Sequence, residues 1–298
     1  MYGRKYFIFY LKLFQRPYAN IMSMRRLFFF FLISFCLLPL FRIDTGRAEA
    51  VFFDVGQGDA FALKTPQGKI IVVDGGPDWS SLKDLERWLG FGRQKIDFLI
   101  LSHGHDDHLA ALPEIAARFK VKNAFLPARL SGSAAAALLE ALKKDGAVVK
   151  YPAADFCLLL ETDCSLCLFP PAASFLKSKD ENDLSLALHF DCAGLSVAAA
   201  GDASQAREKS LLSSDFVWSA QILKISHHGS DSANDPSFQT AISPDMAVIS
   251  VGANNSYGHP SSEVVNRIKQ AGIKIWRTDQ AGSVLFYSNN SKIYFKKY

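Results

Sequence analysis

Histidines and carboxylates gather in short polar loops of this sequence. Six of the seven histidines lie beside Gly, Asp or Ser, and only His189 falls within a strand-like run. Imidazole and carboxylate groups together are typical ligands of zinc, manganese or iron rather than of calcium. The pattern therefore predicts a metal centre. The six loop histidines are His103, His105, His108, His227, His228 and His259.

The densest group is the run His103-x-His105-x-Asp107-His108, between the buried-strand pattern Ile96–Leu101 and a helical pattern. Open α/β sheets place their sites at the C-terminal ends of strands, where this loop would lie. His103 and His105 can point to one side of the loop, and Asp107 and His108 to the other. One loop could thus serve two metals, whereas a helix cap needs one Asp and leaves three histidines unexplained.

Asp202 follows a second apolar strand pattern, Ser196–Ala200. A carboxylate at the end of a buried strand can bridge two cations, and it can also cap the helix predicted over Ser204–Leu212. Considered together with the first histidine run, the bridging role is favoured.

Two further loops supply the remaining histidines. His227 and His228 follow the strand pattern Ile222–Ile225, and at least one of them is expected to bind metal. We favour His228, with His227 either orienting a ligand or donating a proton. His259 stands before the helix that begins at Ser262, and its position alone does not define a role.

The elements that must position these loops are short apolar runs alternating with amphipathic stretches from residue 51 onward. The order is a strand meander, βα units, a second meander and again βα units, with one helix predicted over Leu109–Phe119. That duplication predicts an α/β fold of two mixed sheets packed face to face with helices outside, a four-layer αββα sandwich. Residues 47–298 are predicted to form one domain.

Residues 1–46 are predicted to be a signal peptide or a short membrane anchor. Arg25 and Arg26 precede fifteen uncharged residues, Leu27–Phe41, fewer than the roughly 20 that a membrane span needs. Ala48-Glu49-Ala50 has the form of a cleavage site, but cleavage there would shorten the first strand. We therefore expect an exported or membrane-anchored protein whose N-terminal segment contacts the membrane or the export machinery, and leave cleavage open.

The charge limits the kind of partner. The chain has a formal charge of +4, but its first fifty residues hold an excess of six positive charges, which leaves −2 for residues 51–298. Tight nucleic-acid binding usually requires a basic excess, because neutralising phosphates supplies most non-specific affinity. Contact with a polyanion is therefore expected to be local.

The cysteines are predicted to be structural. Cys164-Ser-Leu-Cys167 has a spacing found in zinc and redox sites, but it lies inside an apolar run and there is no second such pair. In an exported protein, a disulfide among Cys157, Cys164 and Cys167 is an alternative to free thiols.

The histidine run, Gly201-Asp202 and the late histidines resemble the metallo-β-lactamase superfamily in order and spacing. A narrower set of motifs is similar to the C-terminal hydrolase domain of the ComEC/Rec2-type competence DNA-uptake proteins, over about residues 50–295. The motifs are Phe53–Ala60 (FDVGQGDA), Val73–Gly76 (VDGG), Glu181–Leu186 (ENDLSL), Lys224–Ser230 (KISHHGS), Ser256–Pro260 (SYGHP) and Arg277–Asp279 (RTD).

This resemblance implies a phosphodiesterase or nuclease with two divalent metal ions, zinc or manganese, that acts on DNA or nucleotides, and the N-terminal segment adds the expectation of export. Two departures limit the comparison. Only one short apolar segment precedes the domain here, so we do not expect a transporter. In β-lactamases a third metal histidine stands where this chain has Asn182-Asp183, which argues against β-lactam hydrolysis.

The hypothesis for the site has His103 and His105 on one metal, Asp107, His108 and His228 on the other, and Asp202 bridging. Two cations about 3.5–4 Å apart would activate water for in-line attack at phosphorus. His227 and His259 would stabilise charge or protonate the leaving group, and Asn182 would donate to a phosphate oxygen. Asp54, Asp59 and Asp74 would orient ligands or, equally well, fix glycine turns.

Two other functions stay open. One is hydrolysis of a smaller ester, a thioester or a lactam, which the same fold supports. The other is a non-catalytic DNA-binding module of the cell envelope with a structural metal, although structural zinc sites are usually cysteine-rich.

Overall fold

The computed structural model describes residues 46–90, 92, 95–289 and 292–298. The predicted signal peptide or anchor, residues 1–46, lies outside these residues apart from Gly46, so it stays a prediction, as does the domain boundary. Within the described ranges, no helix is long and apolar enough to cross a membrane.

Eight strands of the described residues form the first sheet, in the order β15-β14-β1-β2-β3-β4-β5-β6. The β3–β6 strands are parallel, whereas the other neighbours are antiparallel, so the sheet is mixed. The β14 strand brings the end of the chain back beside β1. The strands are β1 (Glu49–Phe52), β2 (Phe61–Lys64), β3 (Ile70–Val73), β4 (Lys95–Ile100), β5 (Lys120–Phe125), β6 (Val148–Lys150), β14 (Val284–Asn289) and β15 (Lys292–Lys297).

Seven strands of the described residues form the second sheet, in the order β13-β12-β11-β10-β9-β8-β7. Here β10–β13 are parallel and β7–β10 are antiparallel. The strands are β7 (Phe156–Glu161), β8 (Cys164–Phe169), β9 (Ala187–Cys192), β10 (Leu195–Ala199), β11 (Ile222–Lys224), β12 (Met246–Ile249) and β13 (Lys274–Arg277).

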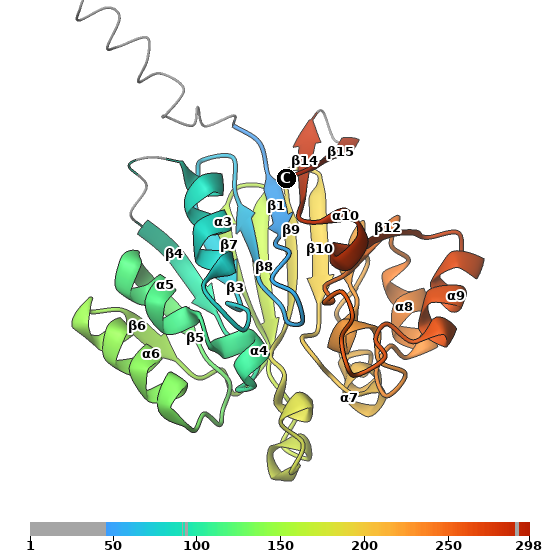
Figure 1. Ribbon diagram of the computed structural model, residues 1–298, viewed down its shortest axis with the longest axis horizontal. Helices are drawn as coiled ribbons and strands as arrows, with labels where there is room; N and C mark the ends of the chain where they lie inside the picture. Colours follow the sequence, from blue (N-terminus) through green and yellow to red (C-terminus); the bar gives the residue numbers. More distant parts are fainter. Residues whose placement is uncertain (1–45, 91, 93–94, 290–291) are drawn as a thin grey trace, which may run out of the picture. The chain divides into compact units, whose positions relative to one another are not determined.

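The two sheets pack face to face, and helices cover their outer faces (Figure 1). Side chains alternate along β10: Val197 belongs to the core between the sheets, and Ala198 packs with the helices outside. Burial on both faces explains why these strands are continuous apolar runs. The predicted four-layer αββα sandwich is confirmed. The helices are α3 (Ser80–Leu89), α4 (Asp106–Leu109), α5 (Leu112–Arg118), α6 (Ser133–Lys144), α7 (Gln205–Leu211), α8 (Pro236–Ile242), α9 (Ser262–Gln270) and α10 (Thr278–Ala281).

The helix predicted over Leu109–Phe119 is wrong in one respect: two helices, α4 and α5, occupy this region. Pro113 lies in the first turn of α5 and has no N–H to donate, which favours a new helix start. Both helices pack closely against Gly75. Gly75 donates its N–H to the His108 carbonyl at 2.7 Å, and a Cβ on Gly75 would lie 2.9 Å from the backbone N of Leu112.

Two disulfides link neighbouring strands of the second sheet. Cys157–Cys167 joins β7 to β8, which confirms the disulfide predicted among the clustered cysteines. Cys164–Cys192 joins β8 to β9 and was not predicted, because the two cysteines are 28 positions apart in sequence and only the strand pairing places them directly opposite. All four cysteines of the described residues are therefore structural.

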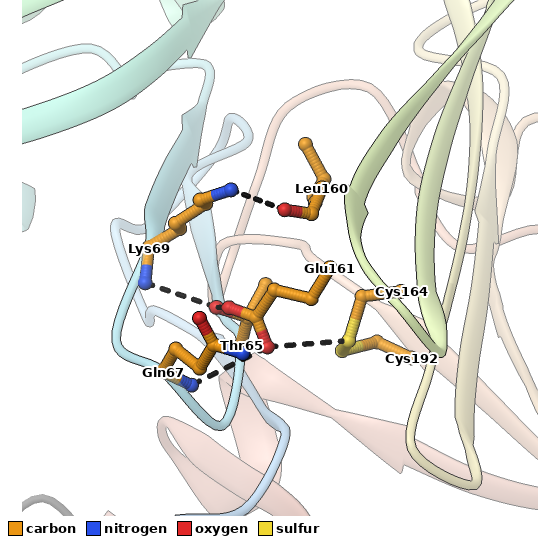
Figure 2. The surroundings of a disulfide bond; sticks show 7 residues. All are labelled: Thr65, Gln67, Lys69, Leu160, Glu161, Cys164 and Cys192. Carbon is orange, nitrogen blue, oxygen red and sulfur yellow. Dashed lines mark hydrogen bonds between the residues drawn. A yellow bond between two sulfur atoms is a disulfide. The ribbon is translucent and has the colours of Figure 1, made fainter.

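The Cys164–Cys192 disulfide lies beside a contact between the two sheets (Figure 2). The carboxylate of Glu161, the last residue of β7, accepts hydrogen bonds from the Thr65 hydroxyl and the Gln67 N–H, both in the turn after β2. In the same place the Lys69 ammonium donates to the Leu160 carbonyl. These bonds join the sheets at the edge opposite to the C-terminal ends of β4, β10 and β11.

Reducing the two disulfides is expected to destabilise the protein without unfolding it at room temperature. The cysteines of the first disulfide are 10 positions apart in sequence, and those of the second are 28 apart. A disulfide that closes such a loop contributes about 2–4 kcal/mol by restricting the unfolded chain. Urea unfolding with and without dithiothreitol measures the change, and thiol titration counts the cysteines released. An unchanged midpoint after complete reduction would contradict this expectation.

Candidate metal centre

The loop after β4, which runs directly into the short helix α4, carries the first four predicted ligands, with Asp107 and His108 in the helix itself. His103 and His108 are fully buried, whereas the Asp107 side chain is 32% exposed and faces a cavity. His103 Nε2 lies 3.1 Å from His105 Nδ1, and the His103 and His108 rings are 4.2 Å apart. The loop thus brings all three imidazoles together.

His108 is oriented by a buried carboxylate. Its Nδ1 lies 2.8 Å from Asp74 Oδ2, and Asp74 is fixed in turn by the N–H and the hydroxyl of Ser102, both at 2.7 Å. This leaves His108 Nε2 facing Asp202 Oδ2 at 3.3 Å. A carboxylate behind an imidazole is the usual way in which proteins aim a metal-binding nitrogen.

His228 is aimed at the same place from the second sheet. Its Nδ1 donates to the Ser250 carbonyl at 2.9 Å, so its Nε2 faces Asp107 Oδ2 at 3.2 Å and Asp202 Oδ2 at 3.4 Å. His227 and His228 both have left-handed backbones, with φ of 49° and 52°, a conformation that costs about 1–3 kcal/mol for each non-glycine residue.

The strained turn is held by Asn234 and Glu208. The Asn234 side chain accepts from the Ser226 N–H and donates to the carbonyls of Ser226 and Ser230, at 2.8–3.1 Å. The buried Glu208 carboxylate accepts from the Ser226 hydroxyl at 2.7 Å. These contacts offset the strain and fix which imidazole faces the cluster.

Four residues form a group that fits a divalent cation. Asp107, His108, Asp202 and His228 each offer one ligand atom, and these atoms lie within 4.8 Å of one another. His108 Nε2 and Asp202 Oδ1 are buried and have no hydrogen-bond partner within the described part of the chain. Two aimed imidazoles and two carboxylates are a donor set that zinc and manganese accept.

Charges within the cluster are balanced against one another. Burial lowers the pKa of His108, but the Asp202 and Asp74 carboxylates raise it more, so this pKa lies well above its usual value. Burial raises the pKa of Asp202, and His108 and His228 more than offset this, so it lies well below its usual value. A cation therefore competes with a proton on His108, and its affinity is expected to rise with pH.

Lys224 is a member of this charge network that sequence reasoning missed. It is 1% exposed on β11, and its ammonium forms an ion pair with the buried Asp59 carboxylate. Lys224 Nζ also lies 3.8 Å from Asp202 Oδ1. A lysine inside a fully buried strand is rare unless it is paired, and that was the signal available in the sequence.

The three acidic residues of the glycine motifs have different roles. Asp74 orients His108, and Asp59 pairs with Lys224, as described above. Asp54 is exposed and accepts from the Gly56 N–H at 3.3 Å, so it fixes a glycine turn. A Cβ on Gly58 would lie 2.3 Å from the Asp107 carbonyl, so this loop can pack against the ligand helix only with glycine there.

The cluster lies at the floor of a cavity of about 550 Å³. Gln57 lines the cavity and accepts from the Gly252 N–H at 3.1 Å, which fastens the loop that carries Tyr257 and His259. The His227 and His259 rings are 5.6 Å apart, and the exposed Tyr257 ring stacks on His259. Both histidines thus reach the space above the cluster.

Five predicted site residues lie outside the group of four: His103, His105, His227, His259 and Asn182. His103 and His105 contact each other beside it, and His227 Nε2 is 4.0 Å from Asp202 Oδ2. Asn182 is 9% exposed on the short 3₁₀ helix η3 (Glu181–Leu184) and is not among the residues that line the cavity. The Glu181 carboxylate, also on η3, lies against Gly104 in the loop after β4, called the metal loop below.

Replacing Glu208 with glutamine is expected to change how stability depends on pH. Burial raises the pKa of Glu208 to about 7, although bonds from Ser226 and Asp235 oppose the shift. Between pH 4.5 and 7 the folded protein therefore holds a proton that the unfolded chain has lost, and the unfolding free energy falls as pH rises. Glutamine cannot titrate.

The unfolding free energy of Glu208→Gln minus that of the parent is the quantity compared. This difference is expected to increase by about 3 kcal/mol between pH 4.5 and pH 7. Urea unfolding at a series of pH values measures it, with the exposed Glu263→Gln as the control. A difference that is flat with pH would show that Glu208 is ionised throughout.

Comparison with known proteins agrees with the fold and the cluster. Residues 53–130, which contain the histidine run, match the family described as the metallo-beta-lactamase superfamily. The structure is similar to the metallo-beta-lactamase fold protein YhfI from Bacillus subtilis, with a TM-score of 0.53 and 12% identity, covering 81% of this chain and 100% of that one. Residues 53–130 thus resemble the metallo-β-lactamase superfamily in sequence, and the fold of the described residues agrees with that resemblance.

Over most of its length the chain also resembles competence proteins, as its motifs predicted. It is 27% identical over 272 residues to ComE operon protein 3 of Bacillus subtilis (strain 168), covering 85% of this chain and 35% of that protein. It is 26% identical over 246 residues to competence protein ComA of Neisseria gonorrhoeae, covering 82% and 33%. The chain thus spans about a third of the length of these relatives.

Proposed function

We propose that this protein is an exported, metal-dependent phosphodiesterase or nuclease that acts on DNA or nucleotides. The observation that carries the proposal is the convergence of His108 Nε2, His228 Nε2 and the Asp107 and Asp202 carboxylates at the floor of an open cavity. Two divalent cations, zinc or manganese, would supply Lewis acidity there, which acidifies water and stabilises charge on phosphoryl oxygens.

The ligand roles follow from where the side chains point. Asp107, His108 and His228 would hold one cation, His103 and His105 the other, and Asp202 would lie between them. Asp74 and the Ser250 carbonyl keep the two Nε2 atoms turned inward, so the chain sets the geometry before any cation binds.

His227 and His259 would act on the substrate. Burial lowers the pKa of both, so both imidazoles are neutral near pH 7. A neutral imidazole can donate its N–H to a phosphoryl oxygen, and it can take a proton from attacking water. Asn182 would donate to a phosphoryl oxygen from η3, beside the residues that line the cavity.

Two observations support the choice of substrate and compartment. The relatives named above are competence proteins, and the exposed Tyr257 ring at the cavity offers a nucleobase a stacking surface. Disulfides persist in oxidising compartments, so the two that link β7, β8 and β9 support export.

The test is a substrate panel with the purified protein and added Mn²⁺ or Zn²⁺. A chromogenic phosphodiester, single-stranded DNA, duplex DNA and a chromogenic cephalosporin are compared side by side. We expect metal-dependent cleavage of the phosphodiester and of DNA. Cleavage of the cephalosporin alone would overturn the proposal, and tight DNA binding without turnover would favour a non-catalytic envelope module.

A further inference from the structure

A second cavity, of about 320 Å³, lies between the segments that follow β6 and β8 and the helix α7. Its residues are distinct from those of the metal cavity. Most of its lining is apolar, with Pro152, Pro170, Pro171 and Leu176 among the contacts, and the Arg207 side chain forms part of its wall. The volume suits a small organic molecule.

Arg207 is buried, being only 2% exposed, and incompletely paired. Its Nη1 donates to the Ser210 hydroxyl at 2.9 Å and its Nη2 to the Phe169 carbonyl at 2.7 Å. Its Nε has no hydrogen-bond partner in the described ranges. A guanidinium has five N–H donors, so the side chain retains donors that a ligand could satisfy.

The charge of Arg207 is met by a cation–π contact, at 6.0 Å from the guanidinium carbon to the centre of the Phe175 ring, but by no close carboxylate among the described residues. Among the described residues, no carboxylate oxygen lies within ion-pair distance of its guanidinium. Two carboxylates act on it from farther away: Asp155, exposed and lining the same cavity, and Asp183, which accepts from the hydroxyls of Ser178 and Ser204. A buried cation without a counterion is costly, and an anion in the cavity would remove that cost.

We propose that this cavity binds a small organic anion. A carboxylate or phosphate group of the ligand would accept hydrogen bonds from Arg207, and its apolar part would contact the proline and leucine walls. The segment lining the cavity continues from Pro170 to η3, where Glu181 lies against the metal loop. The site is thus separate from the metal cluster, and the segment of residues 170–181 links it to the loop that carries His103 and His105.

Binding of benzoate, phenyl phosphate and neutral benzyl alcohol tests the proposal by calorimetry. The full-length Asp202→Ala variant is used, so that phosphate binding by the metal cluster does not contribute. We expect at least one of the two anions to bind saturably and benzyl alcohol not to bind. The tighter anion then identifies carboxylate or phosphate as the recognised group.

Three variants test whether the ligand binds in this cavity. Arg207→Met is expected to weaken binding about tenfold or more, because a hydrogen bond to a charged group is lost. Asp155→Asn is expected to strengthen it about threefold, because a like charge at the rim is removed. Ala172→Trp, at an exposed lining position, is expected to block the cavity, and the exposed Arg118→Met serves as the matched control.

The sign of the Asp155→Asn effect is decisive, because a cationic ligand would bind more weakly to that variant and a neutral ligand would bind about equally to both proteins. Absence of binding by both anions, or binding that is unaffected by Ala172→Trp, would overturn the proposal. Should Arg207→Met not fold, the other two variants still decide it.

Discussion

Replacing Asp202 with alanine is expected to lower turnover by roughly a thousandfold or more while the protein stays folded. Asp202 Oδ2 lies 3.3 Å from His108 Nε2 and 3.4 Å from His228 Nε2, so it is the carboxylate that both aimed imidazoles face. Without Asp202, the ligands of one cation (Asp107, His108 and His228) share no carboxylate with those of the other (His103 and His105). Metal content should therefore fall together with activity.

Elemental analysis of bound metal, circular dichroism and turnover of the phosphodiester measure the three consequences of this substitution. Asp245→Ala provides the matched control, because Asp245 is exposed at the start of β12, at the other end of the strand from the cluster. Full metal content with full turnover in Asp202→Ala would exclude the bridging role of Asp202.

Replacing Lys224 with methionine is expected to destabilise the protein by about 3–5 kcal/mol, a fall in melting temperature of roughly 6–20 °C. Methionine leaves the Asp59 carboxylate buried without its ion-pair partner. Removing one partner of a buried pair costs more than removing both, since the lone charge remains in a poorly solvated place.

The double variant Lys224→Met/Asp59→Asn is therefore expected to recover a large part of the lost stability. Thermal and urea unfolding of the parent, the two single variants and the double variant form a complete mutant cycle. If the two effects were simply additive, the Lys224–Asp59 pair would not be the source of the destabilisation.

The fold could be predicted because its signals are local. A strand such as β10 has apolar residues on both faces, and its pattern is visible in five consecutive residues. The helix break at Pro113 was missed although its cause is also local. The pairing of Cys164 with Cys192 could not be foreseen, because it depends on the register of β8 and β9.

In the candidate site too, residues with a local signal could be predicted, and residues whose partners are distant in sequence could not. His108 and Asp202 stand out by residue type, position after a strand and the company of other ligands. Lys224 and Glu208 act through partners that are distant along the chain, Asp59 and Ser226, so no spacing reveals them. Asn182 is not among the residues that line the cavity, and its role stays a prediction.

The bonds shown in Figure 2 lie at one edge of the sandwich, opposite to the edge where β4, β10 and β11 end and the candidate site lies. The Glu161 contacts and the Cys164–Cys192 disulfide join the sheets and strands at one edge, and the loops with His103, Asp202 and His228 leave the other. Loops at the second edge can therefore be exchanged during evolution or design without loosening the scaffold. New specificities are best sought by grafting loops there, with the cross-linked edge left intact.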